Sequence, residues 1–127
     1  MGICDITLYV NNLEKSKCFY VKYFNAVAEH KKKLADTEID IVLLKFNDGS
    51  RLRLVSRPEI VSSKKFFYDS GYRYFTFSFG SKEALEEAIN RLKEDGYRIL
   101  TSHVYGDNGE YETIVLDTEN NQIVLKE

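Results

Sequence analysis

Apolar and polar residues alternate along residues 3–10, which predicts a strand with one buried face. Its apolar positions are Cys4, Ile6, Leu8 and Val10, and its polar face carries Asp5, Thr7 and Tyr9. The next segment has helical spacing and predicts a helix that starts at Asn11, three residues before Glu14, and stops at Asn25. Strand-like runs follow at about 26–34, 39–46 and 50–56. The turn Asn47-Asp48-Gly49 joins the last two runs as a hairpin. The order predicted for this half is βαβββ.

The same order returns after a connecting segment, residues 58–70. Residues 72–79 alternate, and a helix is expected from Ser81 to Gly96, before strand-like runs at about 97–104, 111–117 and 122–126. Residues 5–10 align with 74–79 and residues 48–54 with 119–125, with matching inner and outer positions. The sequence therefore predicts one α+β domain over residues 1–127, built from tandem βαβββ modules at about 1–57 and 71–127.

The inner face of each first strand is expected to pack against the helix of its own module. These core positions are Ile6, Leu8, Val10, Phe75, Phe77 and Phe79. The opposite face carries an unusual mixture of charged, hydroxyl and aromatic residues: Asp5, Thr7, Tyr9, Arg51, Arg53, Tyr72, Tyr74, Thr76 and Glu112. Such a mixture fits a concave face that holds a small ligand, and an ordinary solvent-exposed strand face is the alternative.

Composition narrows the class of protein. The chain has 127 residues, 18 Lys plus Arg against 20 Asp plus Glu, and no basic stripe, which argues against two full-sized domains and against nucleic acid as a partner. No apolar run reaches a membrane-spanning length, and the start does not resemble a signal peptide. Two cysteines and two histidines argue against a disulfide scaffold and against chemistry that needs several imidazoles. We therefore expect a cytoplasmic protein without a membrane partner.

The ordered set of segments resembles the vicinal oxygen chelate superfamily, which includes glyoxalases, bleomycin resistance proteins and extradiol dioxygenases. The resemblance lies in residues 6–16, 19–24, 46–52 and 109–117 and extends over nearly the whole chain. The turn at 117–121 reads Asp-Thr-Glu-Asn-Asn and lacks the proline and glycine of the family pattern. The resemblance implies a curved mixed sheet with a cavity.

Enzymes of this superfamily hold a divalent metal through four strand positions, which fall here on Asp5, Arg53, Tyr74 and Val124. Only Asp5 is a ready ligand, because a guanidinium repels a cation, a neutral phenol ligates poorly and valine has no lone pair. Glu112 could approach Asp5, but two carboxylates beside an arginine favour ion pairs over Mg²⁺ or Mn²⁺. We therefore predict no metal and no other cofactor, with Asp5 and Arg53 pairing instead.

The function expected from these features is metal-independent binding of a small molecule, as in bleomycin resistance proteins, by a homodimer. The predicted ligand-binding residues are Asp5, Thr7, Tyr9, Arg53, Tyr72, Tyr74, Thr76 and Glu112. Arginine would contact an anionic or carbonyl group, the carboxylates would contact donors or a cation, and the tyrosines would stack on a planar ligand. Two alternatives remain open. One is a lyase, isomerase or dioxygenase with other metal ligands or with Asp5 as base and Tyr74 as acid, and the other is a dimerisation module without a pocket.

Overall fold

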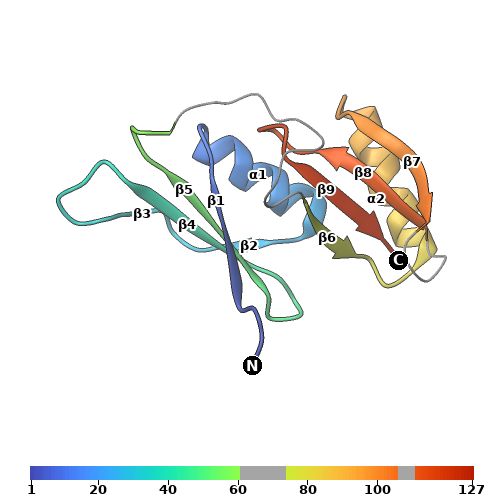
Figure 1. Ribbon diagram of the computed structural model, residues 1–127, viewed down its shortest axis with the longest axis horizontal. Coiled ribbons are helices and arrows are strands. Elements are labelled where there is room, and N and C mark those ends of the chain that lie inside the picture. The colour runs from blue at the N-terminus through green and yellow to red at the C-terminus, as the bar shows by residue number, and fades with distance from the viewer. Residues whose placement is uncertain (61–73, 106–110) are drawn as a thin grey trace. The chain divides into compact units, whose positions relative to one another are not determined.

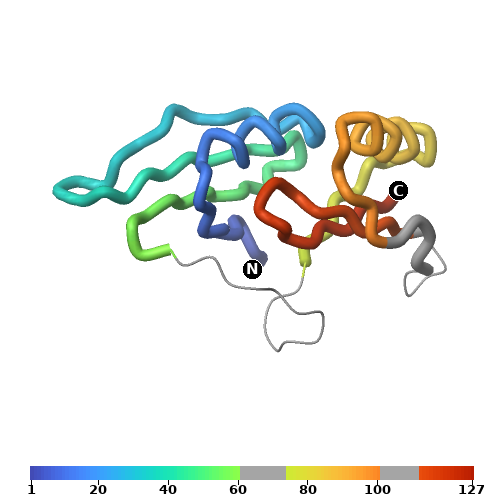
Figure 2. Tube along the Cα trace, turned by 90° about the horizontal axis from the view of Figure 1, so that it is seen from above, coloured from blue at the N-terminus to red at the C-terminus, as the bar shows by residue number. Residues whose placement is uncertain are grey.

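The computed structural model describes residues 1–60, 74–105 and 111–127, with the side chains of 101–105 and 111 left aside (Figure 1). The chain divides into two compact units, Met1–Lys64 and Lys65–Glu127. Each unit contains one mixed sheet and one helix, and the helix lies against one face of its own sheet (Figure 2). The α+β class and the tandem order of elements predicted from the sequence are confirmed.

The first unit is built from β1 (Asp5–Tyr9), α1 (Leu13–Phe24), β2 (Val27–Ala28), β3 (Lys32–Lys33), β4 (Asp40–Lys45) and β5 (Arg51–Ser56). Its sheet has the order β1-β5-β4-β2, and β3 pairs with β4 beside β2. β1 runs parallel to β5, whereas β5, β2 and β3 run antiparallel to β4. The predicted hairpin between β4 and β5 is present, with Gly49 at a φ of 91°.

One predicted strand, residues 26–34, is two short strands in the structure. Ala28 pairs with Leu44 and Lys32 pairs with Ile41, so this side of the ladder holds one residue more than β4 between the two pairs. An extra residue leaves one position unpaired and shifts the register, as a β-bulge does. The irregularity lies on the side of β4 opposite β5, and the ladder between β4 and β5 is continuous.

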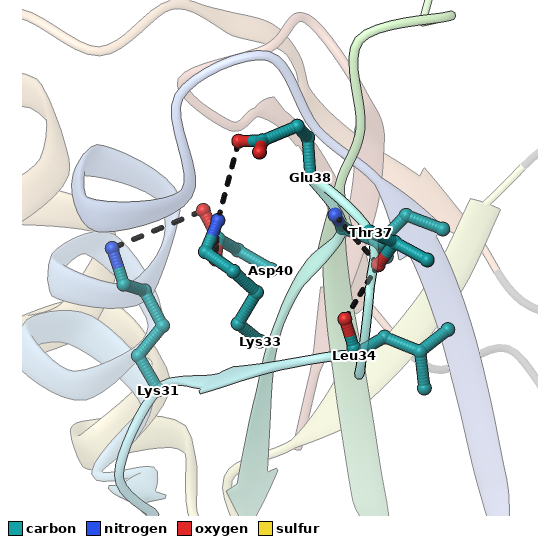
Figure 3. Close-up of polar contacts among 7 residues, drawn as sticks. Lys31, Lys33, Leu34, Thr37, Glu38 and Asp40 are labelled. Carbon is teal, nitrogen blue, oxygen red and sulfur yellow. Dashed lines mark hydrogen bonds and ion pairs between the residues drawn. The ribbon is translucent and has the colours of Figure 1, made fainter.

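Ion pairs join β3 to β4 near their connecting turn (Figure 3). Lys33 Nζ lies 3.2 Å from Asp40 Oδ1 and 3.5 Å from Glu38 Oε2, while Lys31 Nζ lies 3.9 Å from Asp40 Oδ2. The hydrogen bond with Asp40 raises the pKa of Lys33. In the turn, Thr37 Oγ1 donates to the Leu34 carbonyl at 2.7 Å. Exposed lysines on such a strand discourage pairing with another chain, as expected for a strand at a sheet edge.

The core of the first unit lies between α1 and the inner face of the sheet. The buried sheet residues there are Val42, Leu44, Leu52 and Leu54. The helix contributes Phe19, Tyr20, Tyr23 and Phe24, whose rings contact one another in tilted and edge-on pairs. The predicted cap at Asn11 is wrong by one residue: the side chain of Asn12 accepts the Lys15 amide at 3.0 Å. Asn25 ends the helix with a left-handed φ of 54°, as predicted.

The second unit repeats this plan with β6 (Tyr74–Ser78), α2 (Lys82–Glu94), β7 (Ile99–Tyr105), β8 (Tyr111–Leu116) and β9 (Gln122–Lys126). Its sheet has the order β6-β9-β8-β7, with β6 parallel to β9. Ser81 caps α2 by accepting the Ala84 amide at 3.1 Å, as predicted. At the other end, Tyr97 donates to the Leu92 carbonyl and Gly96 to the Lys93 carbonyl, which together form a Schellman motif.

The strand registers reproduce the internal repeat seen in the sequence. Asp5 pairs with Arg51 in the first unit, and the aligned residues Tyr74 and Gln122 pair in the second. No helix in the described part of the chain is long and apolar enough to cross a membrane.

Most of the predicted core residues on β1 and β6, or directly after them, are less buried than expected. Val10 is fully buried, whereas Ile6, Leu8, Phe75, Phe77 and Phe79 are half-buried. β1 and β6 are the outermost strands of their sheets, so a side chain there has a strand neighbour on one side only. Phe75 and Phe77 compensate by packing edge to face, with ring centroids 5.5 Å apart.

Candidate functional site

The face of the first sheet opposite α1, here called the outer face, carries the predicted chemistry of this unit on β1, β5 and β4. Side chains of paired residues point to the same side of a sheet, so the register sorts them into three rows. The charged row contains Asp5, Arg51 and Lys45, the middle row Thr7, Arg53 and Leu43, and the apolar row Tyr9, Val55 and Ile41. The outer face therefore changes from charged to apolar along the strands.

Two arginines share one carboxylate oxygen at the charged end. Arg51 Nη2 lies 3.3 Å from Asp5 Oδ2, and Arg53 Nη2 lies 3.7 Å from the same atom. The ion pair that the sequence predicted between Asp5 and Arg53 is therefore present, and Arg51 joins it to form an ion triad. The triad has two positive charges against one negative charge. All three side chains remain partly exposed, so the guanidinium groups are accessible from solvent.

The third cation of the charged row is neutralised separately. Lys45 Nζ lies 2.7 Å from Glu29 Oε1, and this hydrogen bond is the main cause that lowers the pKa of Glu29. Within the charged row, the excess positive charge therefore resides on the ion triad rather than on Lys45.

Replacing Lys45 with methionine is expected to raise the pKa of Glu29 toward the ordinary glutamate value, because the hydrogen-bonding cation is removed. The folded pKa of Glu29 lies below its unfolded value, so the ion pair stabilises the fold above the ordinary pKa and loses this effect as pH falls through the lowered pKa. Carboxyl ¹³C NMR titration measures the change. Lys15→Met on α1 is the control and leaves the titration unchanged; an equal shift in both variants would contradict the assignment.

Tyr9 is the exposed aromatic group of the apolar row. It is 59% exposed, and the Arg57 guanidinium lies 6.0 Å from its ring centroid. Glu59 Oε2 accepts a hydrogen bond from Arg57 Nε at 2.9 Å, which raises the pKa of Arg57. Beside Tyr9 in the register, Val55 is buried and Ile41 is half-buried. The exposed apolar area of this row is therefore mainly that of Tyr9, with a smaller part from Ile41, which pairs on its other side with Lys32 of β3.

The family metal site does not fit these residues. Of the two inherited positions in the first unit, Asp5 is engaged by two guanidinium groups and Arg53 is itself a cation. A divalent ion at Asp5 would meet both positive charges at close range. In the second unit the inherited positions are a phenol at Tyr74 and Val124, which is 2% exposed. The described residues contain no group of three or more His, Cys, Asp or Glu side chains that could hold a metal ion.

The remaining predicted residues lie on the second sheet, except Tyr72, which is outside the described residues. The pairings of Tyr74 with Gln122, Thr76 with Val124 and Glu112 with Lys126 place all these side chains on one face. Tyr74 and Thr76 are exposed, and Glu112 is half-buried. The structure thus groups Asp5, Thr7, Tyr9 and Arg53 on one sheet and Tyr74, Thr76 and Glu112 on the other. That both groups line a single cavity stays a prediction.

The charged row of the first sheet has no charged counterpart in the aligned row of the second sheet. The repeat aligns Asp5, Arg51 and Lys45 with Tyr74, Gln122 and Leu116, which form the corresponding row of the second sheet. No member of that second row is charged at neutral pH. On the same face of the second sheet, charge lies instead at the paired residues Glu112 and Lys126.

Arg51 and Lys45 are the residues that the predicted ligand-binding set omitted. Arg51 could have been included, because it precedes Arg53 by two positions and therefore shares its face. Lys45 can be assigned to the same row only when the hairpin register is known, because that register pairs it with Arg51. The β5–β1 register then places Arg51 directly beside Asp5.

Comparison with known proteins agrees with this architecture. The glyoxylase/bleomycin resistance protein/dioxygenase domain from Frankia sp. EAN1pec has a TM-score of 0.82 and 16% identity, covering 99% of this chain and 96% of that one. A trypanothione-dependent glyoxalase I from Leishmania major has a TM-score of 0.76 and 16% identity, covering 99% and 86%. A genomically encoded fosfomycin resistance protein from Listeria monocytogenes has a TM-score of 0.73 and 17% identity, covering 99% and 90%.

These structural likenesses show the fold, and the family follows from the sequence match. No curated protein matches the chain significantly. Residues 2–125 match the Glyoxalase/Bleomycin resistance protein/Dioxygenase superfamily. The resemblance recognised in the sequence is confirmed, and the chain belongs to this superfamily.

Proposed function

We propose that this protein binds a small molecule on the outer face of the first sheet without a metal ion. The observation that carries the proposal is the ion triad: Arg51 and Arg53 surround the one carboxylate, Asp5, that the family's metal position retains. Arg53 replaces a metal ligand with a hydrogen-bond donor, so the same position can attract an anionic or carbonyl oxygen.

Each group on the outer face has a definite part in this binding. The two guanidinium groups supply donors, Thr7 supplies a hydroxyl group in the middle row, and Tyr9 supplies an aromatic surface for a planar group. Asp5 holds the arginines together on the sheet. The homodimer and the cytoplasmic location expected from the sequence belong to the same proposal.

In this proposal, direct binding of the ligand takes the place of the metal-dependent chemistry of the family. The relatives include a glyoxalase I and a fosfomycin resistance protein by name. Nothing in the ion triad favours the enzymatic alternative over binding, because its carboxylate is already paired with cations.

A metal-loading experiment combined with a ligand screen tests the proposal. The purified protein is incubated with Mn²⁺, Fe²⁺, Ni²⁺ or Zn²⁺, desalted and analysed for metal content, and we expect essentially none per chain. In parallel, a thermal-shift screen of planar drug-like and metabolite molecules is run in the presence of EDTA. We expect stabilising compounds whose effect survives the chelator.

Near one equivalent of metal per chain would overturn the metal-free proposal and restore the chelate chemistry, with Asp5 and Glu112 as the first ligands to replace. A screen without a single stabilising compound would contradict small-molecule binding itself and favour the pocketless module.

A further inference from the structure

We propose that the outer face selects an apolar carboxylic acid, with its carboxylate on Arg51 and Arg53 and its apolar body over the apolar row. This inference rests on the proposed function and adds the ligand's charge, its polarity and its orientation on the sheet. Three independent features of the described residues support it: the charge of the ion triad, the geometry of its contacts and the order of the rows.

The first feature is the charge. Two guanidinium groups surround one carboxylate, so the ion triad lacks one negative charge. Lys45 is compensated by Glu29 at 2.7 Å, and Arg57 is compensated by Glu59 at 2.9 Å. A ligand with one negative charge would complete the balance, whereas a cation would meet the repulsion of both arginines.

The second feature is the way the arginines are used. Each contacts Asp5 through a single atom, Nη2, and both approach the same oxygen at 3.3 and 3.7 Å. A guanidinium has five N–H donors and can bind a carboxylate through two parallel hydrogen bonds. Most donors of Arg51 and Arg53 therefore remain outside the contacts with Asp5. A ligand carboxylate can accept these hydrogen bonds without displacing Asp5.

The third feature is the order of the rows. Arg51 lies in the charged row, Arg53 in the middle row, and Tyr9 in the apolar row beside Val55 and Ile41. Neighbouring rows are two residues apart along each strand, or about 7 Å. A carboxylate at the arginines would thus place a hydrophobic group roughly 7–13 Å away over the apolar row. A small hydrophilic anion would make no contact with the apolar row, and a neutral hydrocarbon would form no hydrogen bonds with the arginines.

Three probes separate these requirements: 4-phenylbutyrate, its neutral amide 4-phenylbutyramide, and acetate. Each is titrated into the ¹⁵N-labelled full chain, and amide shifts are followed by NMR at several salt concentrations. We expect 4-phenylbutyrate to shift amides of β1, β5 and β4 and to bind at least roughly ten-fold more tightly than the amide. Added salt should weaken the binding of 4-phenylbutyrate and leave the binding of the amide unchanged. Acetate should bind more weakly than 4-phenylbutyrate, because it lacks an apolar body.

Two variants assign the two ends of the ligand. Arg51→Gln should remove most of the advantage of the acid over the amide, because it removes one of the two charges that bind the carboxylate. Tyr9→Ala should weaken the binding of the acid and of the amide by a similar factor, because it removes apolar contact area. Lys15→Gln on α1 is the matched control, since it removes one positive charge from the element packed on the other face of the sheet. It should change neither affinity.

The outcomes separate this inference from the proposed function. Equal binding of acid and amide at β1 and β5 would overturn the selection for an acid and leave small-molecule binding intact. Equal binding of acetate and 4-phenylbutyrate would overturn the role of the apolar row. No shift with any probe would also overturn the inference, and the thermal-shift screen in EDTA would then decide the proposed function by itself.

Discussion

Arg53→Ala is expected to weaken ligand binding at the outer face strongly while the chain keeps its fold. The guanidinium is 44% exposed and lies 3.7 Å from Asp5. Hydrogen bonds between a charged donor and a ligand are each worth about 1.5–3 kcal/mol, so the loss of Arg53 should weaken binding roughly 10- to 100-fold. Because exposed ion pairs contribute little, the free energy of unfolding should fall by less than about 1 kcal/mol.

Isothermal titration calorimetry with compounds that stabilise the wild-type chain measures the loss, and urea unfolding measures the stability. Lys15→Ala on α1 serves as the control for a general loss of positive charge. An unchanged affinity in Arg53→Ala would remove Arg53 from the site. A large loss of stability would instead mean that the residue supports the sheet rather than the ligand.

Leu54→Ala is expected to cause a large loss of stability, about 2–5 kcal/mol. Leu54 is 0% exposed, and it lies on the inner face of β5 between Leu8 and Val42. Truncation at this central strand leaves a cavity beneath α1 that the flanking strands cannot close without breaking their hydrogen bonds. The urea midpoint followed by circular dichroism gives the change, with the slope of the transition checked against the wild type.

The matched control is Leu34→Ala, the same chemical change at a side chain in the turn after β3 that is half-exposed. It should lower the stability by no more than about 0.5 kcal/mol. Similar losses in the two variants would show that the inner face of the first sheet is not the part of the chain that limits its stability.

Local patterns determined most of the fold. The alternation on β1 and β6, the helix ends at Asn25, Ser81 and Gly96, and the hairpin at Gly49 all depend on residues close together in the sequence. Short-range steric and hydrogen-bonding preferences govern such features. The internal repeat predicted matching inner and outer positions in both modules, and the registers pair the aligned residues in the same way in both units.

Errors occurred where a long-range contact decided between similar local options. Asn11 and Asn12 are equally suitable caps, and the course of the chain after β1 selects Asn12. The bulge between β2 and β3 depends on pairing with β4, which lies further along the chain. The half-burial of Phe75 and Phe77 follows from the outer position of β6 in its sheet. The alternation along β6 does not reveal where the strand lies in the sheet.

The sequence by itself determined the family and the order of elements, because these depend on which residue types stand at which strand positions. From the same positions it predicted that the metal-ligand set is missing, which the metal-loading experiment tests. It also indicated that Asp5 and Arg53 would pair. Only the tertiary structure decided that Arg51 completes the ion triad. The reason is the register: β1 and β5 are separated by α1 and three other strands, and parallel pairing across that distance brings Arg51 beside Asp5.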